Sequence, residues 1–156
     1  MPVSQAEFRR ALSCFASGVN VVTTIDAAGE LHGLTVSAFC SVSLAPPMVL
    51  ICIEKTTASH FAFLESRAFV VNILDESQSA LSDHFATPLP DKFIGLGYRS
   101  GIAGIPVLEN SLANLECRIR HNFDGGDHSI FVGEVELATI RDGKPLVYFQ
   151  GGYRTI

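Results

Sequence analysis

The chain has 156 residues, and its formal net charge at pH 7 is -5. A length of this order predicts a single domain, residues 1–156, that buries most of its surface on folding. The 11 Lys and Arg residues are scattered along an acidic chain, which argues against nucleic acid as a partner, because phosphate binding needs clustered cations. Hydrophobic residues make up 47% of the chain and charged residues only 17%, so part of the apolar surface is expected to meet a second copy, with a generous core as the alternative.

The sequence shows neither a membrane span nor a secretion signal. No stretch approaches the roughly 20 apolar residues of a spanning helix, and the N-terminus MPVSQAEFRR lacks an apolar core. We therefore expect a cytoplasmic protein with no membrane partner. Its cysteines, Cys14, Cys40, Cys52 and Cys117, are far apart and have no CxxC spacing, which favours buried, reduced thiols over a disulfide or a metal site.

The first predicted element is a helix that begins near Ser4 and ends near Gly18. Ser4 and Glu7 have the spacing of a capping box, and Gly18 is placed to end the helix. Three apolar residues recur at i, i+4 and i+7 and are expected to face the core: Phe8, Leu12 and Phe15.

A hairpin and two buried strands follow. Residues 19–25 and 30–38 are predicted strands, and residues 26–29, with the sequence DAAG, form the tight turn between them. Residues 48–53 and 68–73 are continuous apolar runs rich in β-branched side chains. We expect both runs to be buried strands.

Short helices are predicted at residues 59–66 and 77–85. The run from residue 86 to residue 111 is rich in proline and glycine and is expected to be a long irregular loop.

The last third of the chain returns to β structure. Residues 115–120 alternate apolar and charged side chains, which indicates a strand with one wet face. A turn is predicted at residues 124–127, and a long strand at residues 130–140, where Gly133 is expected to make a bulge. Another strand covers residues 145–149. The pattern as a whole predicts a mainly β protein with appended helices, built as a small closed or nearly closed antiparallel barrel.

Several catalytic motifs are missing from the sequence. It contains no GxSxG, HExxH or GxxxxGK[ST] pattern, and the glycines of residues 95–101 are wrongly spaced for a dinucleotide-binding turn. The carboxylates are not obviously paired. We therefore predict no side chain acting as a nucleophile or general acid/base, and no metal site.

Hydroxyl side chains recur along residues 35–43 at the period of a strand. Thr35, Ser37, Ser41 and Ser43 would then lie on one side, where hydroxyls and main-chain amides suit the pyrimidine edge and ribityl chain of a flavin. The alternative is an edge strand with a polar solvent face.

A basic hydroxyl cluster follows the strand at residues 48–53. Lys55, Thr56, Thr57 and Ser59 open the next helix, a place where amides, hydroxyls and a cation can converge on a phosphate. The alternative is an ordinary helix cap.

Two weaker clusters lie near the C-terminus. In the sequence GGDH, Asp127 and His128 project from the start of a strand, although such an Asp commonly bonds its own turn. Tyr153 and Arg154 combine an aromatic face with a guanidinium that can stack on rings or pair with phosphate, although an Arg in a tail is usually solvated.

The order and spacing of these pieces resemble the flavin reductase family with the FMN-binding split-barrel fold. The similarity extends from about Phe8 to Arg154 and rests on GVNVVTT, HGLTVSAFCSVSLAPPMVLICI, KTTAS, FVVNIL, HFA, DKF, GGDHSIFVGEV and PLVYFQGGYR.

The resemblance implies a role for each matching position. The isoalloxazine and ribityl parts of the flavin would contact Thr35, Val36, Ser37, Ala38, Ser41, Val42 and Ser43. The phosphate end would be surrounded by Cys52, Ile53, Glu54, Lys55, Thr56 and Ser59. Phe85 would lie near the flavin or its adenine extension, and the nicotinamide nucleotide would dock at His128, Tyr153 and Arg154.

The resemblance also implies an NAD(P)H:flavin oxidoreductase that passes a hydride from NADH to FMN or FAD and supplies reduced flavin to a partner monooxygenase. NADPH is the alternative donor. Family members of this kind are usually homodimers, and we expect the flavin to behave as a substrate or a loosely held cofactor. Two rival hypotheses remain, namely a non-catalytic or electron-transfer FMN-binding protein on the same barrel, and a ligand-binding barrel with no redox role.

Overall fold

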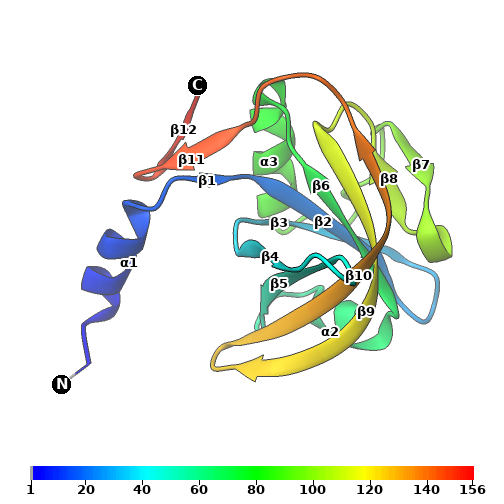
Figure 1. Ribbon diagram of the computed structural model, residues 1–156, viewed down its shortest axis with the longest axis horizontal. Helices are drawn as coiled ribbons and strands as arrows, with labels where there is room; N and C mark the ends of the chain where they lie inside the picture. The colour runs from blue at the N-terminus through cyan, green and yellow to red at the C-terminus, as the bar shows by residue number, and fades with distance from the viewer. Residues whose placement is uncertain (1) are drawn as a thin grey trace.

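The computed structural model describes residues 2–156, which form a mainly β molecule around one seven-stranded antiparallel sheet in the order β3-β2-β6-β9-β10-β5-β4 (Figure 1). The helices are α1 (Gln5–Ser13), α2 (His60–Glu65) and α3 (Ser79–Ala86), with 3-10 turns η1 (Glu76–Gln78) and η2 (Ile102–Gly104). The strands are β1 (Ser17–Gly18), β2 (Asn20–Ile25), β3 (Leu31–Val36), β4 (Phe39–Ser43), β5 (Met48–Glu54), β6 (Ala68–Ile73), β7 (Tyr98–Ser100), β8 (Pro106–Leu108), β9 (Ala113–Gly125), β10 (His128–Ile140), β11 (Val147–Phe149) and β12 (Gly152–Arg154).

The main sheet curves around its own core. Strands from both ends of the sheet order contribute to one buried cluster, which contains Val36 of β3, Ile51 of β5 and Phe69 of β6. The chain passes from edge strand β3 to edge strand β4 through only Ser37 and Ala38. The two edges are not paired with each other, so the sheet is strongly curved but not closed into a barrel.

The longest hairpin joins β9 to β10 and carries the predicted bulge. The register of the pair shifts between Val132 and Gly133, and again between Val135 and Leu137, so the bulge expected at Gly133 is confirmed. A Cβ atom added at Gly133 would lie 2.7 Å from Phe69 Cζ, because the backbone passes directly over the core there. The turn ending this hairpin also matches the prediction, with Gly126 at φ +79.

Each predicted strand overlaps an observed one, but some bounds differ: β3 ends at Val36 and not at residue 38, and β9 extends from Ala113 to Gly125 and not only over residues 115–120. Residues 68–73 form β6 with the expected bounds, and its first five residues are buried. The apolar run at residues 48–53 forms β5, but its residues alternate between buried and half-buried. A continuous apolar run therefore did not mean burial on both faces, because only one face of β5 covers the main core.

The sequence predicted a long irregular loop from residue 86 to residue 111, but part of this segment is regular. Strands β7 and β8 pair within it and η2 lies between them. Ile105 and Val107 are buried against Ala68 and Val70 of β6, which is why this part of the segment is ordered. The prediction relied on the glycine and proline content of the segment, which does not indicate these apolar contacts.

The prediction for the first helix was wrong in its packing. The capping box of Ser4 and Glu7 is present, but α1 ends at Ser13, and it projects from the body of the molecule instead of packing on the core (Figure 1). Its apolar residues Phe8 and Leu12 are therefore largely exposed, by 55% and 56%, and Phe15, which follows the helix, is exposed by 77%.

The cysteines are free thiols, but they are not all buried as expected. Cys117 lies in the main core and Cys52 is half-buried, whereas Cys14 and Cys40 are exposed. Cys14 caps the projecting helix α1, and Cys40 belongs to edge strand β4, so neither is covered by other elements. None of the helices within residues 2–156 has the length and apolar character that a membrane crossing requires.

Candidate functional site

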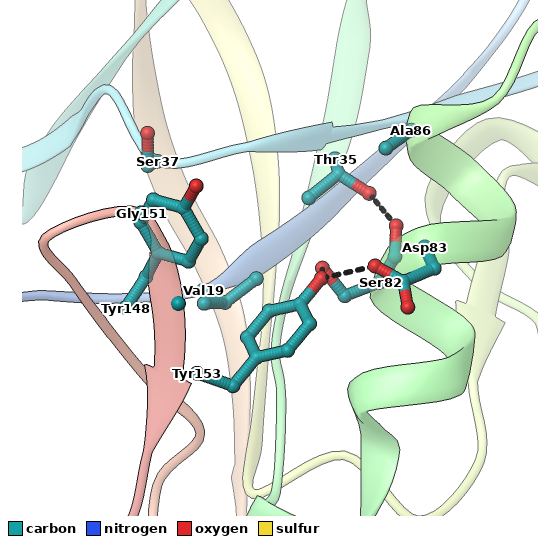
Figure 2. Close-up of a pocket in the computed structure, with 10 residues that line it drawn as sticks. Val19, Thr35, Ser37, Ser82, Asp83, Ala86, Tyr148, Gly151 and Tyr153 are labelled. Atoms are coloured by element: carbon teal, nitrogen blue, oxygen red, sulfur yellow. Dashed lines mark hydrogen bonds between the residues drawn. The ribbon is translucent and has the colours of Figure 1, made fainter.

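A cavity of about 490 Å³ opens between β3, α3 and the C-terminal strands (Figure 2). Its lining residues are Val19, Thr35, Ser37, Ser82, Asp83, Ala86, Tyr148, Gly151, Gly152 and Tyr153. The short strand β11 pairs with β1 on one side and with β12 on the other. Tyr148 and Tyr153 are opposite each other in the β11–β12 pair and lie on one wall, with their rings 5.7 Å apart. We call this space the first cavity.

Hydrogen bonds fix the polar wall of the first cavity. Thr35 Oγ1 donates to the carbonyl of Ser82 at 2.6 Å, which ties β3 to α3. The Tyr153 hydroxyl donates to Asp83 Oδ1 at 2.6 Å and lies 2.8 Å from Ser82 Oγ (Figure 2). Burial raises the pKa of Tyr153, and the bond to Asp83 adds to the effect, so the phenol stays protonated near neutral pH.

A second cavity, of about 710 Å³, lies beside the first and is lined by Leu34 and Thr35 of β3. Thr35 and Ala86 line both cavities, so the two are neighbours, and we call them together the cleft. The other residues around the second cavity are Leu34, Glu54, Thr56, Thr57, Ala58, Ser59, Phe85, Pro88, Leu89 and Lys92. This cavity thus collects the hydroxyl cluster at the start of α2 and the loop that follows α3.

Lys92 supplies a cation to the second cavity. Its Nζ donates to the carbonyls of Phe85 at 2.9 Å and Gly33 at 3.1 Å, and these acceptors carry no formal charge. Within residues 2–156, no carboxylate lies at ion-pair distance from Lys92. Burial lowers the pKa of this amine, and an anion in the cavity would offset that effect.

The structure places the predicted cation, Lys55, differently. Its Nζ is paired with Asp124 and donates to the carbonyl of Gly126 at 2.6 Å, so it is held by the β9–β10 turn. Lys55 lines neither cavity, although its neighbours Glu54 and Thr56 line the second. The role predicted for Lys55 stays a prediction.

The hydroxyl residues of segment 35–43 do not share one strand, which corrects the sequence interpretation. Thr35 lies in β3 and Ser37 in the connection after it, and both line the first cavity. Ser41 and Ser43 lie in β4, at the opposite edge of the sheet, with a register shift between them. The period of two is interrupted because the chain leaves one edge strand and enters another.

Other residues predicted at the flavin differ in their surroundings. Phe85 is buried beneath the second cavity, and Val36 and Ile53 are buried in the main core. Cys52 is half-buried, and its backbone N–H donates to the carbonyl of Ala38 at 3.1 Å. Ala38 and Val42 are exposed, as are Ser41, Glu54, Lys55 and Thr56, whereas Ser43 is half-buried.

The residues predicted at the nicotinamide fall into two places. His128 stands at the β9–β10 turn, where its Nδ1 lies 2.7 Å from Asp127 Oδ1, and it is the cross-strand neighbour of Glu54 on the wall of the second cavity. Tyr153 lines the first cavity, and Arg154 donates to the carbonyl of Tyr153 at the exposed end of β12. The β9–β10 turn and the β11–β12 strands lie on opposite sides of the molecule in Figure 1.

Sequence reasoning missed several cavity residues, among them Ser82, Asp83 and Lys92. Ser82 and Asp83 were placed on a predicted helix with no sign of which face meets β3. Lys92 belongs to the DKF triplet within a segment that was expected to be irregular. The short spacing between Lys92 and Phe85 is the only sequence signal that could have placed Lys92 at the same site.

Comparison with known proteins identifies the relatives of this chain. Residues 12–156 match the model of the flavin reductase like domain. The reductase component of 4-nitrophenol 4-monooxygenase/4-nitrocatechol 2-monooxygenase from Rhodococcus opacus is 41% identical over 152 residues, which cover 97% of this chain and 81% of that protein. The FMN reductase (NADH) SmoA of Agrobacterium fabrum is 42% identical over 146 residues, covering 94% and 83%.

A solved relative has the same fold. The NADH:FAD oxidoreductase SgcE6 of Streptomyces globisporus, in complex with NAD and FAD fragments, superimposes with a TM-score of 0.92 at 35% identity, covering 98% of this chain and 93% of that one. The domain match covers most of the chain, and several relatives exceed 30% identity over nearly all of it. The chain therefore belongs to the flavin reductase-like family.

Proposed function

We propose that the protein is an NAD(P)H:flavin oxidoreductase that transfers a hydride from NADH to FMN or FAD and supplies reduced flavin to a partner monooxygenase. Family membership and the activities of the relatives support this function, since the relatives include an FMN reductase (NADH) and the reductase component of a monooxygenase. NADPH is the alternative donor. We assign the activity to residues 1–156 as a single domain.

The neighbouring positions of the two cavities are the observation that carries the proposal. Ligand sites commonly measure about 300 to 1,000 Å³, and here two spaces of that size share Thr35 and Ala86 in their walls. One end offers hydroxyls and aromatic rings, and the other offers the Lys92 amine with Thr56 and Ser59. A long ligand with a flat polar ring at one end and a phosphate at the other fits this distribution of groups.

The residues of the cleft are assigned to binding and orientation. Thr35 and Ser37 would hold the ring system, with Ala38 beside the cleft, and Thr56, Ser59 and Lys92 would hold the phosphate. When bound, the flavin supplies the hydride acceptor for the nicotinamide. Holding two reactants in contact can lower the activation barrier by on the order of 7 to 11 kcal/mol. Positioning of the two rings is therefore enough for the protein to accelerate the reaction.

The remaining site predictions are kept as part of the proposal. Val36, Ser41, Val42, Ser43, Cys52, Ile53, Glu54, Lys55 and Phe85 are assigned to the flavin side. The nicotinamide side is assigned to His128, Tyr153 and Arg154. The cavity position of Tyr153 and the place of His128 beside Glu54 support a role at the cleft.

We further propose the FMN-binding split barrel as the fold and a homodimer as the assembly. The curvature of the main sheet, with β3 and β5 packing on one core, supports the first. The exposed apolar face of α1 supports the second. We also expect bound flavin to exchange with free flavin in solution, because the cleft is open. A cytoplasmic location remains a prediction.

The assignment is tested by mixing the purified protein with NADH alone, with NADH and FMN, and with NADH and FAD, while the absorbance of NADH is followed. Loss of NADH that requires added flavin is expected. Flavin binding without NADH oxidation would indicate an electron-transfer protein instead, and the absence of flavin binding would indicate a barrel without a redox role. Repeating the assay with NADPH identifies the donor.

A lysine pair tests the orientation of the flavin. Lys92→Met should weaken FMN binding by about tenfold, since a hydrogen bond to a charged group contributes about 1.5 to 3 kcal/mol. Riboflavin, which lacks the phosphate, should bind the variant and the wild type alike. Lys144→Met, which removes an exposed lysine outside both cavities, is the control. Equal loss of FMN and riboflavin affinity would contradict the placement of the phosphate.

A further inference from the structure

His32 of β3 connects the hairpin turn to the start of α2. Its Nε2 lies 2.8 Å from Asp26 Oδ2, and its Nδ1 lies 3.4 Å from Ser59 Oγ. The His32 ring meets the Phe61 ring edge to face, with centroids 5.2 Å apart, which fixes the plane of the imidazole. The side chains of His32 and Asp26 are only 18% and 7% exposed, so the chain of contacts is largely shielded from water.

The direction of the Asp26–His32 hydrogen bond follows from elementary chemistry. An ionised carboxylate can only accept, so Nε2 of His32 carries a proton whether the ring is neutral or charged. Oδ1 of Asp26 is occupied by the N–H groups of Ala28 and Glu30, each at 2.9 Å. The bond from His32, together with the backbone N–H of Glu30, lowers the pKa of Asp26 and keeps it ionised near neutral pH.

The Ser59 hydroxyl then has two possible directions. Ser59 stands at the N-cap of α2 but makes no side-chain capping bond, so its hydroxyl is not committed to the helix. With a neutral ring, Nδ1 of His32 is an acceptor, and the Ser59 hydroxyl donates a hydrogen bond to it. With a charged ring, Nδ1 donates to Ser59 Oγ, and the hydroxyl proton is free to point into the second cavity, which Ser59 lines.

We propose that Asp26 and His32 control the direction of the Ser59 hydroxyl, so that binding of the flavin phosphate in the second cavity is coupled to protonation of His32. Binding would draw one proton from solvent onto His32, and Ser59 would donate its own hydroxyl hydrogen to a phosphate oxygen. His32 and Asp26 are thus positioning residues that act through Ser59. This inference rests on the proposed function, because it names the chemistry by which that site recognises its ligand.

Other charged groups surround this chain of contacts. Glu65 of α2 accepts from the backbone N–H of Ala27 at 3.1 Å, and Glu30 lies in the same hairpin. Glu54 and Lys92 face the second cavity from its other walls. Comparison of variants that keep all four groups therefore isolates the contribution of His32.

Asp26→Asn tests the proposal by reversing one hydrogen bond. The backbone donors of Ala28 and Glu30 would hold the carbonyl of the new side chain at the Oδ1 position, so its NH₂ group faces His32 Nε2. A neutral His32 must then carry its proton on Nδ1 and donate to Ser59. The hydroxyl is released without any change in charge, and the variant should bind FMN tightly even at high pH.

The measurement is FMN affinity by calorimetry from about pH 5.5 to about pH 8, the range in which histidine side chains change charge. At the upper limit, Asp26→Asn should bind FMN about tenfold more tightly than the wild type, or by about 1.4 kcal/mol. Ser59→Ala should bind weakly at every pH. The phosphate of FMN itself changes charge at about pH 6. The dissociation constant of the wild type is therefore divided by that of each variant at the same pH. Riboflavin should show the same pH dependence in all three proteins.

Asp142→Asn, in an exposed turn, is the matched control and should follow the wild type. Because Asp26→Asn could impair folding, nitrogen NMR of the wild-type His32 ring provides a second measurement, in which FMN should shift the ring toward its charged form and riboflavin should not. Identical pH profiles in all variants, or an unchanged ring spectrum with FMN bound, would overturn the coupling alone. Absence of both FMN and FAD binding in every protein would instead refute the proposed function.

Discussion

At the scale of single residues, Cys117 shows how burial alters a side chain. Its thiol lies in the main core, and burial raises its pKa to about 12, with the neighbouring Glu116 charge adding to the effect. The unfolded chain would lose this proton near pH 9, whereas the folded chain keeps it. The folded state therefore binds more protons than the unfolded state over this interval, so stability must fall as pH rises through it.

We therefore expect the free energy of unfolding to decrease between about pH 9 and about pH 12 through this one thiol. Cys117→Ala should be less stable at pH 7, because it leaves a cavity, but should lose less of its stability on going to high pH. Urea unfolding at several pH values measures the slope. Cys14→Ala, which changes an exposed thiol, serves as the control and should retain the wild-type slope. Equal slopes for Cys117→Ala and the wild type would contradict the assigned shift.

At the scale of elements, the cleft depends on how closely β3 approaches α3 and the loop after it. Gly33 makes the close approach possible, since a Cβ atom there would lie 2.7 Å from Phe85 Cε1 and 3.1 Å from Phe93 Cζ. Phe85 is almost fully buried and cannot move aside freely. The carbonyl of Gly33 also accepts the bond from Lys92. One glycine thus sets the spacing between β3 and the cation of the second cavity.

Gly33→Ala should lower the free energy of unfolding by about 1 to 3 kcal/mol, the usual cost of overpacking a core, and should weaken FMN binding because Phe85 and Lys92 are displaced. Gly18→Ala is the matched control, because nothing lies within 4 Å of the added atom, and its effect should stay within about 0.5 kcal/mol. Urea denaturation and FMN titration are the measurements. A Gly33 variant as stable as the Gly18 variant would show that the two elements can separate without cost.

At the scale of the whole molecule, α1 and the sheet enclose an apolar space that the single chain does not fill. A cavity of about 570 Å³ is lined by Phe8 and Leu12 of α1 and by Phe15 after it, together with Phe39 and Tyr148. Apolar side chains left open to water over such an area favour association with a second surface. Ser37, Tyr148 and Gly151 line this space and the first cavity alike, so the proposed dimer contact adjoins the cleft.

Leu12→Asp should convert the proposed homodimer into a monomer, because a carboxylate would be buried without a partner at the interface. Ala6→Asp places the same charge on the same helix and should leave the dimer intact, since residue 6 does not line the apolar space. Light scattering coupled to size exclusion gives the mass of each protein. A wild-type monomer, or a dimer that survives Leu12→Asp, would refute the assembly through α1.

Local patterns were sufficient for most elements of the sheet. The bounds of β6, the turns at residues 26–29 and 124–127, and the bulge at Gly133 follow from β-branched runs and glycine positions, which act over a few residues. The order of the motifs was likewise sufficient to indicate the family, as the domain match confirms. These properties depend on neighbours in the chain, so the sequence alone determined them.

Tertiary structure decided which side chains meet. Thr35 bonds to Ser82 across 47 positions of sequence, and Lys55 pairs with Asp124 across 69. The predicted cation, Lys55, is therefore bound to the β9–β10 turn, and Lys92 lines the second cavity instead. The exposure of α1 and the approach of His32 to Ser59 likewise depend on how distant segments are arranged by the sheet order. Residue periodicity specifies the face of an element, but the partner of that face is set by packing between segments far apart in the chain.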